Sequence, residues 1–264
     1  MTEVFRLKQG KVPLLVSFPH SGEALPDSLR PRLTDEALTL DDTDHLLPEL
    51  YDFVEALGGS TIEACYSRYV IDMNRPPDDA SLYPGQNTTG IMPVIDFFGR
   101  SIYRPGAEPA ADERADRIEA YWKPYHEALA AELERLRALH GAVLLWDAHS
   151  IRNTLPYLFA GTLPDLNIGT SAGASAGARI EAAVELAAAR SEAYSVVNNG
   201  RFKGGYITRH YGKPLRGIHA VQLEMSKTIY LGRSQRPPFD DNRASALRVT
   251  LRDMLGAALE ALIV

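Results

Sequence analysis

Two histidines stand just beyond segments that are expected to be buried strands. The apolar run Val12–Phe18 precedes His20, and the apolar run Ala142–Trp146 precedes His149. In an open α/β sheet, ligands bind in the crevice beyond the carboxyl ends of the strands. We therefore expect the two imidazoles to lie close together, where they could bind one metal ion.

A catalytic metal site needs a third protein ligand and an open position for water. Asp44, at the expected start of the first helix, and Glu23, which forms a His-x-x-Glu spacing with His20, compete for this place. We favour Asp44 and keep Glu23 as the alternative. Cys65 is the single cysteine of the chain, so the ligands must be His and carboxylate side chains. Such a set suits zinc, iron, cobalt or manganese, and we expect one Zn²⁺ ion.

Glu224 is the candidate general base. It lies near the end of the expected late strand 218–225, where a carboxylate is costly to bury unless it is paired or used. A carboxylate there could take a proton from a metal-bound water and later protonate the leaving amine. The alternative is a structural Glu paired with an arginine, in which case His210 and Asp147 are the next candidates for the base.

Basic residues gather in the segments that should line the crevice, although the net charge of the chain is −6. A guanidinium group matches a carboxylate in bidentate geometry. Each of these residues could instead be a solvated loop charge, but together they indicate a small substrate with two carboxylates. The candidate substrate-binding residues are Arg68, Asn74, Arg75, Arg201 and Arg209, with Arg104 and Lys203 in the same segments.

Strand-like and helix-like segments alternate along the chain. This pattern predicts an α/β fold with a mostly parallel mixed sheet and helices on both faces. We expect one domain over residues 1–264. Strands are expected at 12–18, 60–66, 69–73, 142–146, 194–197 and 218–225, and helices at 46–57, 111–140, 178–190 and the C-terminal end. A Gly- and Pro-rich loop should span about 74–109, and Pro124 should kink or divide its helix.

Composition excludes several classes of protein. The acidic chain has no basic run that could follow a phosphate backbone, so nucleic acid is not an expected partner. It has no apolar run of about 18 residues, as a spanning helix needs, and no apolar core of a signal peptide at its start. We therefore expect a cytoplasmic protein that does not enter a membrane; its oligomeric state cannot be inferred.

Two other classes of function deserve a test. The pattern G-x-S-x-G occurs around Ser171 and again around Ser175, as in serine hydrolases. The preceding segment 163–168 is a poor strand, however, and no histidine follows the possible triad acid Asp240. The second alternative is a non-catalytic dicarboxylate-binding protein, which would need neither metal nor base.

Several segments, spread over nearly the whole chain, form a specific combination. They are 19–22, 42–44, 66–76, 145–150, 199–205 with 208–210, and 222–224. This combination resembles the N-formylglutamate deformylase (N-formylglutamate amidohydrolase) family of histidine degradation. The resemblance implies a phosphorylase/hydrolase-like fold akin to zinc carboxypeptidases, and hydrolysis of N-formyl-L-glutamate to L-glutamate and formate.

The order of the candidate site residues also resembles that of metal amidases that cleave peptidoglycan. Those enzymes place a His after a strand, an acidic ligand at the next helix start, a second His at a strand end and a Glu on a late strand. The matching residues here are His20, Asp44, His149 and Glu224. Members of the deformylase family need not carry an acid at the position of Glu23, which counts against the His-x-x-Glu spacing.

Overall fold

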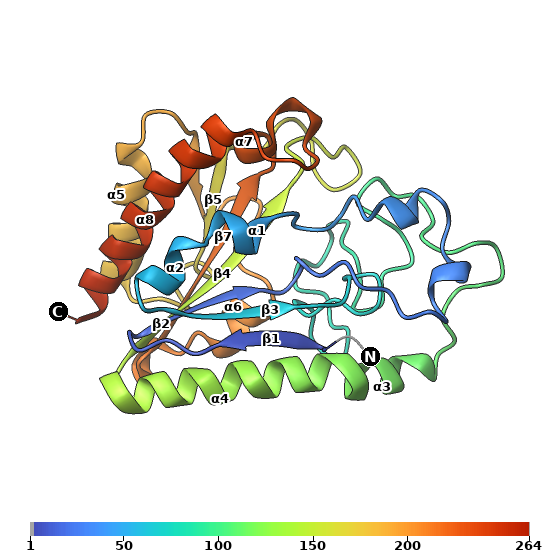
Figure 1. The fold of residues 1–264 in the computed structure, drawn as a ribbon, viewed down its shortest axis with the longest axis horizontal. Coiled ribbons are helices and arrows are strands. Elements are labelled where there is room, and N and C mark those ends of the chain that lie inside the picture. The colour runs from blue at the N-terminus through green and yellow to red at the C-terminus, as the bar shows by residue number, and fades with distance from the viewer. Residues whose placement is uncertain (1–2, 264) are drawn as a thin grey trace.

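A computed structural model describes residues 3–263, and these residues form one seven-stranded sheet (Figure 1). The strand order is β1-β3-β2-β4-β7-β5-β6. The strands are β1 (Phe5–Lys8), β2 (Leu14–Phe18), β3 (Ser60–Ala64), β4 (Val143–Ile151), β5 (Leu166–Gly169), β6 (Val196–Asn198) and β7 (Ile218–Ser226). The central strands β3, β2, β4 and β7 are parallel, whereas β1 and β5 pair antiparallel to their neighbours β3 and β7. The predicted mostly parallel mixed sheet is confirmed.

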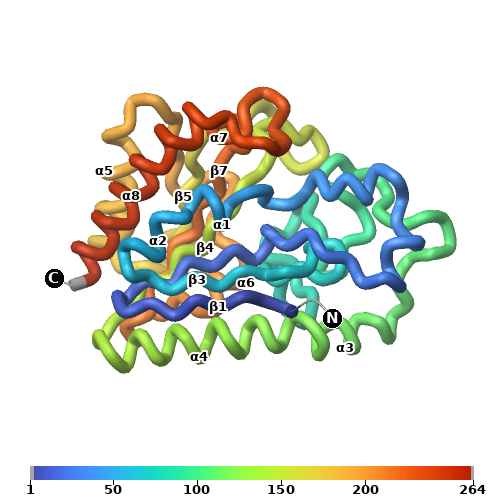
Figure 2. Tube along the Cα trace, viewed as in Figure 1, coloured from blue at the N-terminus to red at the C-terminus, as the bar shows by residue number. Residues whose placement is uncertain are grey.

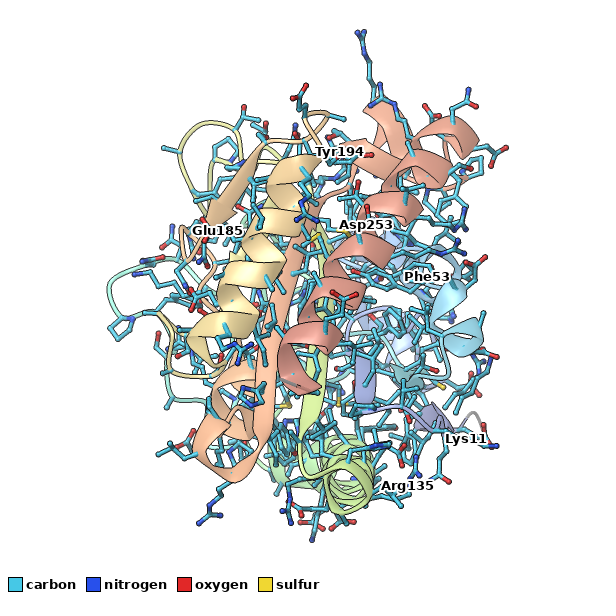
Figure 3. The ribbon with its side chains drawn as sticks, turned by 90° about the vertical axis from the view of Figure 1, so that its left-hand side faces the viewer. Lys11, Phe53, Arg135, Glu185, Tyr194 and Asp253 are labelled. Carbon is cyan, nitrogen blue, oxygen red and sulfur yellow. The ribbon has the colours of Figure 1, made fainter. Side chains whose placement is uncertain are left out.

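Helices cover both faces of this sheet. They are α1 (Leu47–Leu50), α2 (Phe53–Ala56), α3 (Glu113–Arg117), α4 (Lys123–His140), α5 (Ala178–Arg190), α6 (Tyr206–Tyr211), α7 (Thr228–Leu231) and α8 (Asp241–Ile263). Figure 3 shows α5, which carries Glu185, side by side with α8, which carries Asp253. Helix α4 runs along the opposite face of the sheet (Figure 1). In this described part of the chain, no helix is long and apolar enough to cross a membrane.

The alternation of side chains along β2 explains this layering. Leu14 and Val16 pack in the cluster that contains the apolar residues of α5 and α8. Leu15 points to the other face and packs in the cluster that contains Leu129 and Leu133 of α4. Because successive side chains of a strand project to opposite faces, a strand of consecutive apolar residues needs a helical layer on each side.

The loops that follow the parallel strands gather at one end of the sheet, on the right in Figures 1 and 2. The described chain has no helix or strand between Ala64 and Glu113, so the predicted long loop is even longer than 74–109. The predicted strand 69–73 is therefore wrong. Its apolar residues are buried, but the amide of Val70 bonds locally to Ser67 O at 2.8 Å instead of joining a ladder.

Other differences concern element boundaries. The predicted helix 46–57 is divided into α1 and α2, and β1 was not predicted. Strand β5 begins inside segment 163–168, which has a poor strand pattern, and α6 lies in the Gly-rich basic segment 198–211. The expectation for Pro124 is supported, because a π-helical turn at Ile118–Trp122 separates α3 from α4 just before it. Proline has no amide hydrogen for the normal helical bond, and a π turn is a common local adjustment.

Candidate active site

The candidate site is built on a row of polar side chains on one face of β4 and β7. Residues two apart on a strand share a face, so Asp147 and His149 project together from β4. In the parallel register, His149 pairs with Glu224 and Asp147 with Gln222. His149 thus lies inside β4 rather than beyond its end, because β4 continues to Ile151. The four polar side chains form one row near the carboxyl ends of the strands.

The three predicted metal ligands come together beside this row. His20, Asp44 and His149 are buried, and one ligand atom from each lies within 4.8 Å of the others. Asp44 Oδ2 is 3.2 Å from His149 Nδ1 and 3.8 Å from His20 Nδ1. Asp44 does not cap a helix, since α1 has no side-chain cap. Its carboxylate is therefore available to a cation.

Each of the two histidines turns its other ring nitrogen toward a buried carboxylate. His20 Nε2 is 2.7 Å from Asp72 Oδ1, and His149 Nε2 is 3.1 Å from Asp147 Oδ2. Metal-binding histidines usually donate their second N–H to such a carboxylate, which fixes the ring and its tautomer. The donor set and its surroundings therefore fit a divalent cation bound by the two Nδ1 atoms and Asp44.

Long-range hydrogen bonds place Asp44. The Asp44 amide donates to His20 O at 2.9 Å, which ties the two ligand-bearing turns together. Lys227, buried just after β7, donates from Nζ to Asp41 O at 2.9 Å and to Thr43 O at 2.7 Å. Lys227 was not predicted from the sequence as a residue of the site. In the sequence, Lys227 stands out only as a lysine directly after an apolar strand. That position does not indicate which groups its ammonium binds.

Glu224 lies in the same cleft as the three ligands and is buried. Burial raises the pKa of its carboxyl to about 8, and the neighbouring Asp44 carboxylate acts in the same direction. A carboxyl with a pKa in this range can both accept and donate a proton near neutral pH. The two reserve candidates are less well placed. Asp147 accepts hydrogen bonds from Ser17 and Asn74 beneath His149, and neither Asp147 nor His210 lines the cleft.

The cleft is open to solvent and encloses about 590 Å³, its mouth included. Arg75 and Arg201 line it, and neither has a carboxylate partner among residues 3–263. The Arg75 guanidinium donates to Thr89 O at 2.8 Å. Both guanidinium groups are therefore held by neutral groups and can receive an anion.

Arg68 and Asn74 also line the cleft, but their side chains already have protein partners. The Arg68 guanidinium pairs with Asp72 at 2.5 Å, and its Nη1 lies 3.3 Å from His20 Nδ1. The Asn74 amide nitrogen is 3.1 Å from Asp147 Oδ2 and 2.9 Å from His149 Nε2. Arg68 therefore lies beside the predicted metal ligands, and Asn74 donates to Asp147, the carboxylate behind His149.

The remaining basic candidates do not reach the cleft. The Arg209 guanidinium bonds to Gly204 O at 2.8 Å and lies against the ring of Tyr83. Arg104 forms a surface ion pair with Asp35, and Lys203 is exposed. Arg209, Arg104 and Lys203 are therefore not placed to bind a substrate carboxylate in the cleft. Their local hydrogen bonds and solvent exposure could not be inferred from sequence spacing.

The rival ligand Glu23 also lies away from the site. Its carboxylate is 61% exposed and lies 2.9 Å from His45 Nδ1. The alternative serine-hydrolase sites fare no better. The Ser175 hydroxyl is buried and donates to Ala220 O at 2.8 Å, and in the described part of the chain no histidine bonds to Ser171 or Ser175. The structure offers no catalytic serine arrangement there.

Comparison with known proteins agrees with the sequence resemblance. The family described as N-formylglutamate amidohydrolase matches residues 12–231. The N-formylglutamate deformylase of Pseudomonas aeruginosa is 49% identical over 259 residues, covering 98% of this chain and 97% of that protein. The N-formylglutamate deformylase of Pseudomonas putida is 46% identical, with the same coverage of 98% and 97%.

Solved structures show the same fold. The crystal structure of N-formylglutamate amidohydrolase from Ralstonia eutropha JMP134 has a TM-score of 0.79 and 23% identity, covering 98% of this chain and 96% of that one. A gene product from Agrobacterium tumefaciens has a TM-score of 0.74 and 19% identity, with coverage of 98% and 96%. Together with the sequence matches over nearly the full length, these findings show that the chain belongs to the N-formylglutamate amidohydrolase family.

Proposed function

We propose that this protein hydrolyses the formamide C–N bond of N-formyl-L-glutamate, giving L-glutamate and formate. The observation that carries the proposal is the buried group of His20, Asp44 and His149 beside Glu224, in a cleft with two arginines that have no carboxylate partner. The names of the two Pseudomonas relatives support the same substrate. We further propose that the reaction belongs to histidine degradation and takes place in the cytoplasm.

The metal is proposed to be a single divalent ion, with zinc as the expected one. His20 Nδ1, His149 Nδ1 and a carboxylate oxygen of Asp44 would hold it. Such an ion activates a water molecule and polarises a carbonyl oxygen when it is bound. Asp72 and Asp147 would keep the histidine rings in orientation through the Nε2 atoms.

Glu224 is proposed to move the proton. Its carboxylate accepts a proton from the attacking water, and the carboxyl then donates it to the amide nitrogen as the C–N bond breaks. Arg68, beside His20, offers N–H groups to the formyl oxygen as negative charge develops there. The hydroxyl of the water molecule ends on the formyl carbon and its proton on the nitrogen. The products are formate and glutamate with a free amino group.

Arg75 and Arg201 are proposed to bind the two carboxylates of the substrate. Guanidinium groups without a competing carboxylate can form bidentate bonds to each of them. A dicarboxylate-binding protein would also use these arginines, but it would have no use for a buried carboxylate beside three metal-ligating side chains. Turnover therefore separates the two functions.

The direct test measures the release of formate and glutamate from N-formylglutamate by the purified protein. We expect the two products in equal amounts, loss of activity after chelation, and recovery when zinc is added back. N-formylglutamine, in which an amide replaces the γ-carboxylate, should be a much poorer substrate. Binding of N-formylglutamate without turnover in the metal-loaded protein would contradict the proposed reaction.

A further inference from the structure

Three loops meet at the mouth of the cleft and are joined by hydrogen bonds. They are residues 77–90, 152–163 and 199–205. Asn87 Nδ2 in the first loop donates to Tyr157 O in the second at 2.7 Å. Arg201 Nη2 in the third loop lies 3.3 Å from both Asn87 O and Leu158 O. Arg201 therefore lies where all three loops converge.

Tyr83, in the first loop, fastens that loop to the third. Its hydroxyl donates to Gly204 O at 2.9 Å and accepts a bond from the Lys203 amide at 3.1 Å. The guanidinium carbon of Arg201 is 5.4 Å from the centre of the Tyr83 ring, and that of Arg209 is 4.8 Å from it. Both distances are in the range of a cation–π contact. One tyrosine thus contacts the only two arginines of the third loop and of α6.

The partners of Arg201 leave its charge available. Two backbone carbonyls and the rings of Tyr83 and Phe202 hold the guanidinium, and none of them carries a negative charge. Arg209, by contrast, is bound to Gly204 O and does not line the cleft. The ring of Tyr83 can therefore orient Arg201 for an incoming anion without competing for it.

Arg201 contacts a more exposed part of the cleft lining than Arg75 does, since the partners of Arg75 are buried. Arg75 directly follows Asn74, whose side chain contacts the metal-ligating His149. Arg201 instead contacts the carbonyls of Asn87 and Leu158 in the outer loops. A substrate whose formyl group reaches His149 would thus bring its nearer carboxylate toward Arg75 and its farther one toward Arg201.

We propose that Tyr83 is a positioning residue that sets Arg201 for the γ-carboxylate of the substrate, and so helps to determine specificity for a dicarboxylate. This inference rests on the proposed function. It assigns the selectivity of the cleft to a pair of residues from two different loops, rather than to the arginine alone.

The test compares kcat and KM for N-formylglutamate and N-formylglutamine in five metal-loaded proteins. These are the wild type, Tyr83→Phe, Arg201→Met, the double variant, and Tyr157→Phe as the matched control. Tyr157 is on a neighbouring loop, and Tyr157→Phe also removes one tyrosine hydroxyl. Unlike that of Tyr83, the Tyr157 hydroxyl has no hydrogen-bond partner in residues 3–263. The thermal midpoint of each variant is measured in parallel, so that loss of fold is seen directly.

We expect Arg201→Met to lower kcat/KM for N-formylglutamate about 10²-fold, because the γ-carboxylate of the bound substrate loses its charged partner. The kcat/KM for N-formylglutamine, which lacks that carboxylate, should change little. Tyr83→Phe should lower kcat/KM for N-formylglutamate about fivefold, mainly by raising KM, as expected for the loss of one hydrogen-bonding hydroxyl. In the double variant, Tyr83→Phe should add no further loss, and Tyr157→Phe should behave as wild type.

Two results would overturn the role of Tyr83 while the proposed function stands. The first is an equal loss on both substrates in Tyr83→Phe, and the second is a loss in the double variant that equals the product of the single losses. A wild-type protein that fails to hydrolyse N-formylglutamate would overturn the proposed function, and the inference would fail with it.

Discussion

His149 and Glu224 are register partners on the adjacent parallel strands β4 and β7, and both side chains project from the same face of the sheet. Adjacent strands are about 4.8 Å apart, so the sheet itself fixes the separation of their backbones. The spacing of the proposed metal ligand and the proposed base therefore depends little on loop motion. Because the β4–β7 ladder is made by backbone groups, a change of the Glu224 side chain should leave His149 in place. The proposed proton transfer can therefore be tested at Glu224 alone.

Glu224→Gln should lower kcat about 10²- to 10⁴-fold, because the amide keeps the size of the side chain but cannot accept the proton. Metal content and the far-UV spectrum should match those of the wild type. Steady-state kinetics and metal analysis of the same sample check both points. Near-normal turnover would remove Glu224 from the mechanism.

Asp44→Ala should lose the metal, because only two ligating side chains remain in the buried group. Glu23→Ala is the matched control, since its carboxylate is exposed and bonds to His45. Metal per chain, measured after dialysis, should fall well below one for Asp44→Ala and stay unchanged for Glu23→Ala. The opposite pattern would restore the His-x-x-Glu spacing as the ligand set.

Gly205→Ala should weaken metal binding through Asn74. A Cβ at position 205 would lie 2.4 Å from Asn74 Nδ2 and 2.5 Å from its Oδ1, so Asn74 must move away from His149 and Asp147. Disturbing groups that support a metal ligand typically costs about 10- to 100-fold in affinity or activity. Competition with a chromogenic chelator measures the affinity.

Gly256→Ala in α8 is the control for this change, because a Cβ at position 256 meets no atom within 4 Å. It should leave metal affinity and kinetics unchanged. Its thermal midpoint should rise slightly, since alanine is favoured over glycine in a helix by about 1 kcal/mol. Unaltered metal affinity in Gly205→Ala as well would mean that Asn74 does not support the site.

Glu113, which does not line the cleft, should contribute to stability in a pH-dependent way. Hydrogen bonds from Arg32 lower the pKa of the Glu113 carboxyl from 4.5 to about 2. A lowered pKa stabilises the folded protein above the unfolded value, and this contribution is lost as pH falls from 4.5 toward 2. The group is partly exposed, so we expect only about 1 kcal/mol.

Urea unfolding of the wild type and Glu113→Gln between pH 7 and pH 3 measures this contribution. The difference in unfolding free energy should be constant near neutral pH and should shrink below the ordinary pKa of a glutamate. A difference that does not depend on pH would mean that Glu113 stabilises the protein by packing rather than by its charge.

The sequence by itself determined the parts of the fold that depend on local pattern. Apolar runs identified β2, β4 and β7, and the position of polar residues within or after them identified His20, His149 and Glu224. These inferences succeed because side chains alternate along a strand and because the ends of parallel strands meet at one edge.

Local pattern failed where the chain leaves regular structure. Residues 69–73 are apolar enough for a strand, yet they form turns, and Asp72 among them supports His20. Strand β5 has a poor local pattern but is stabilised by its pairing with β7. The Val70 amide bonds locally to Ser67 O, whereas the Asp72 amide bonds to Ile91 O and the strand pairing of β5 joins it to β7, so tertiary contacts replaced the expected strand pattern.

Only the tertiary structure decided which of several chemically similar residues form the site. Asp44 and Glu23 were equivalent in type, but Lys227, about 180 residues away, holds the turn that carries Asp44 in place. Arg201 and Arg209 are both basic residues of one segment, yet only Arg201 lines the cleft. A carboxylate or guanidinium group is directed by its hydrogen-bond partners, and those partners come from loops that meet only when the sheet has formed.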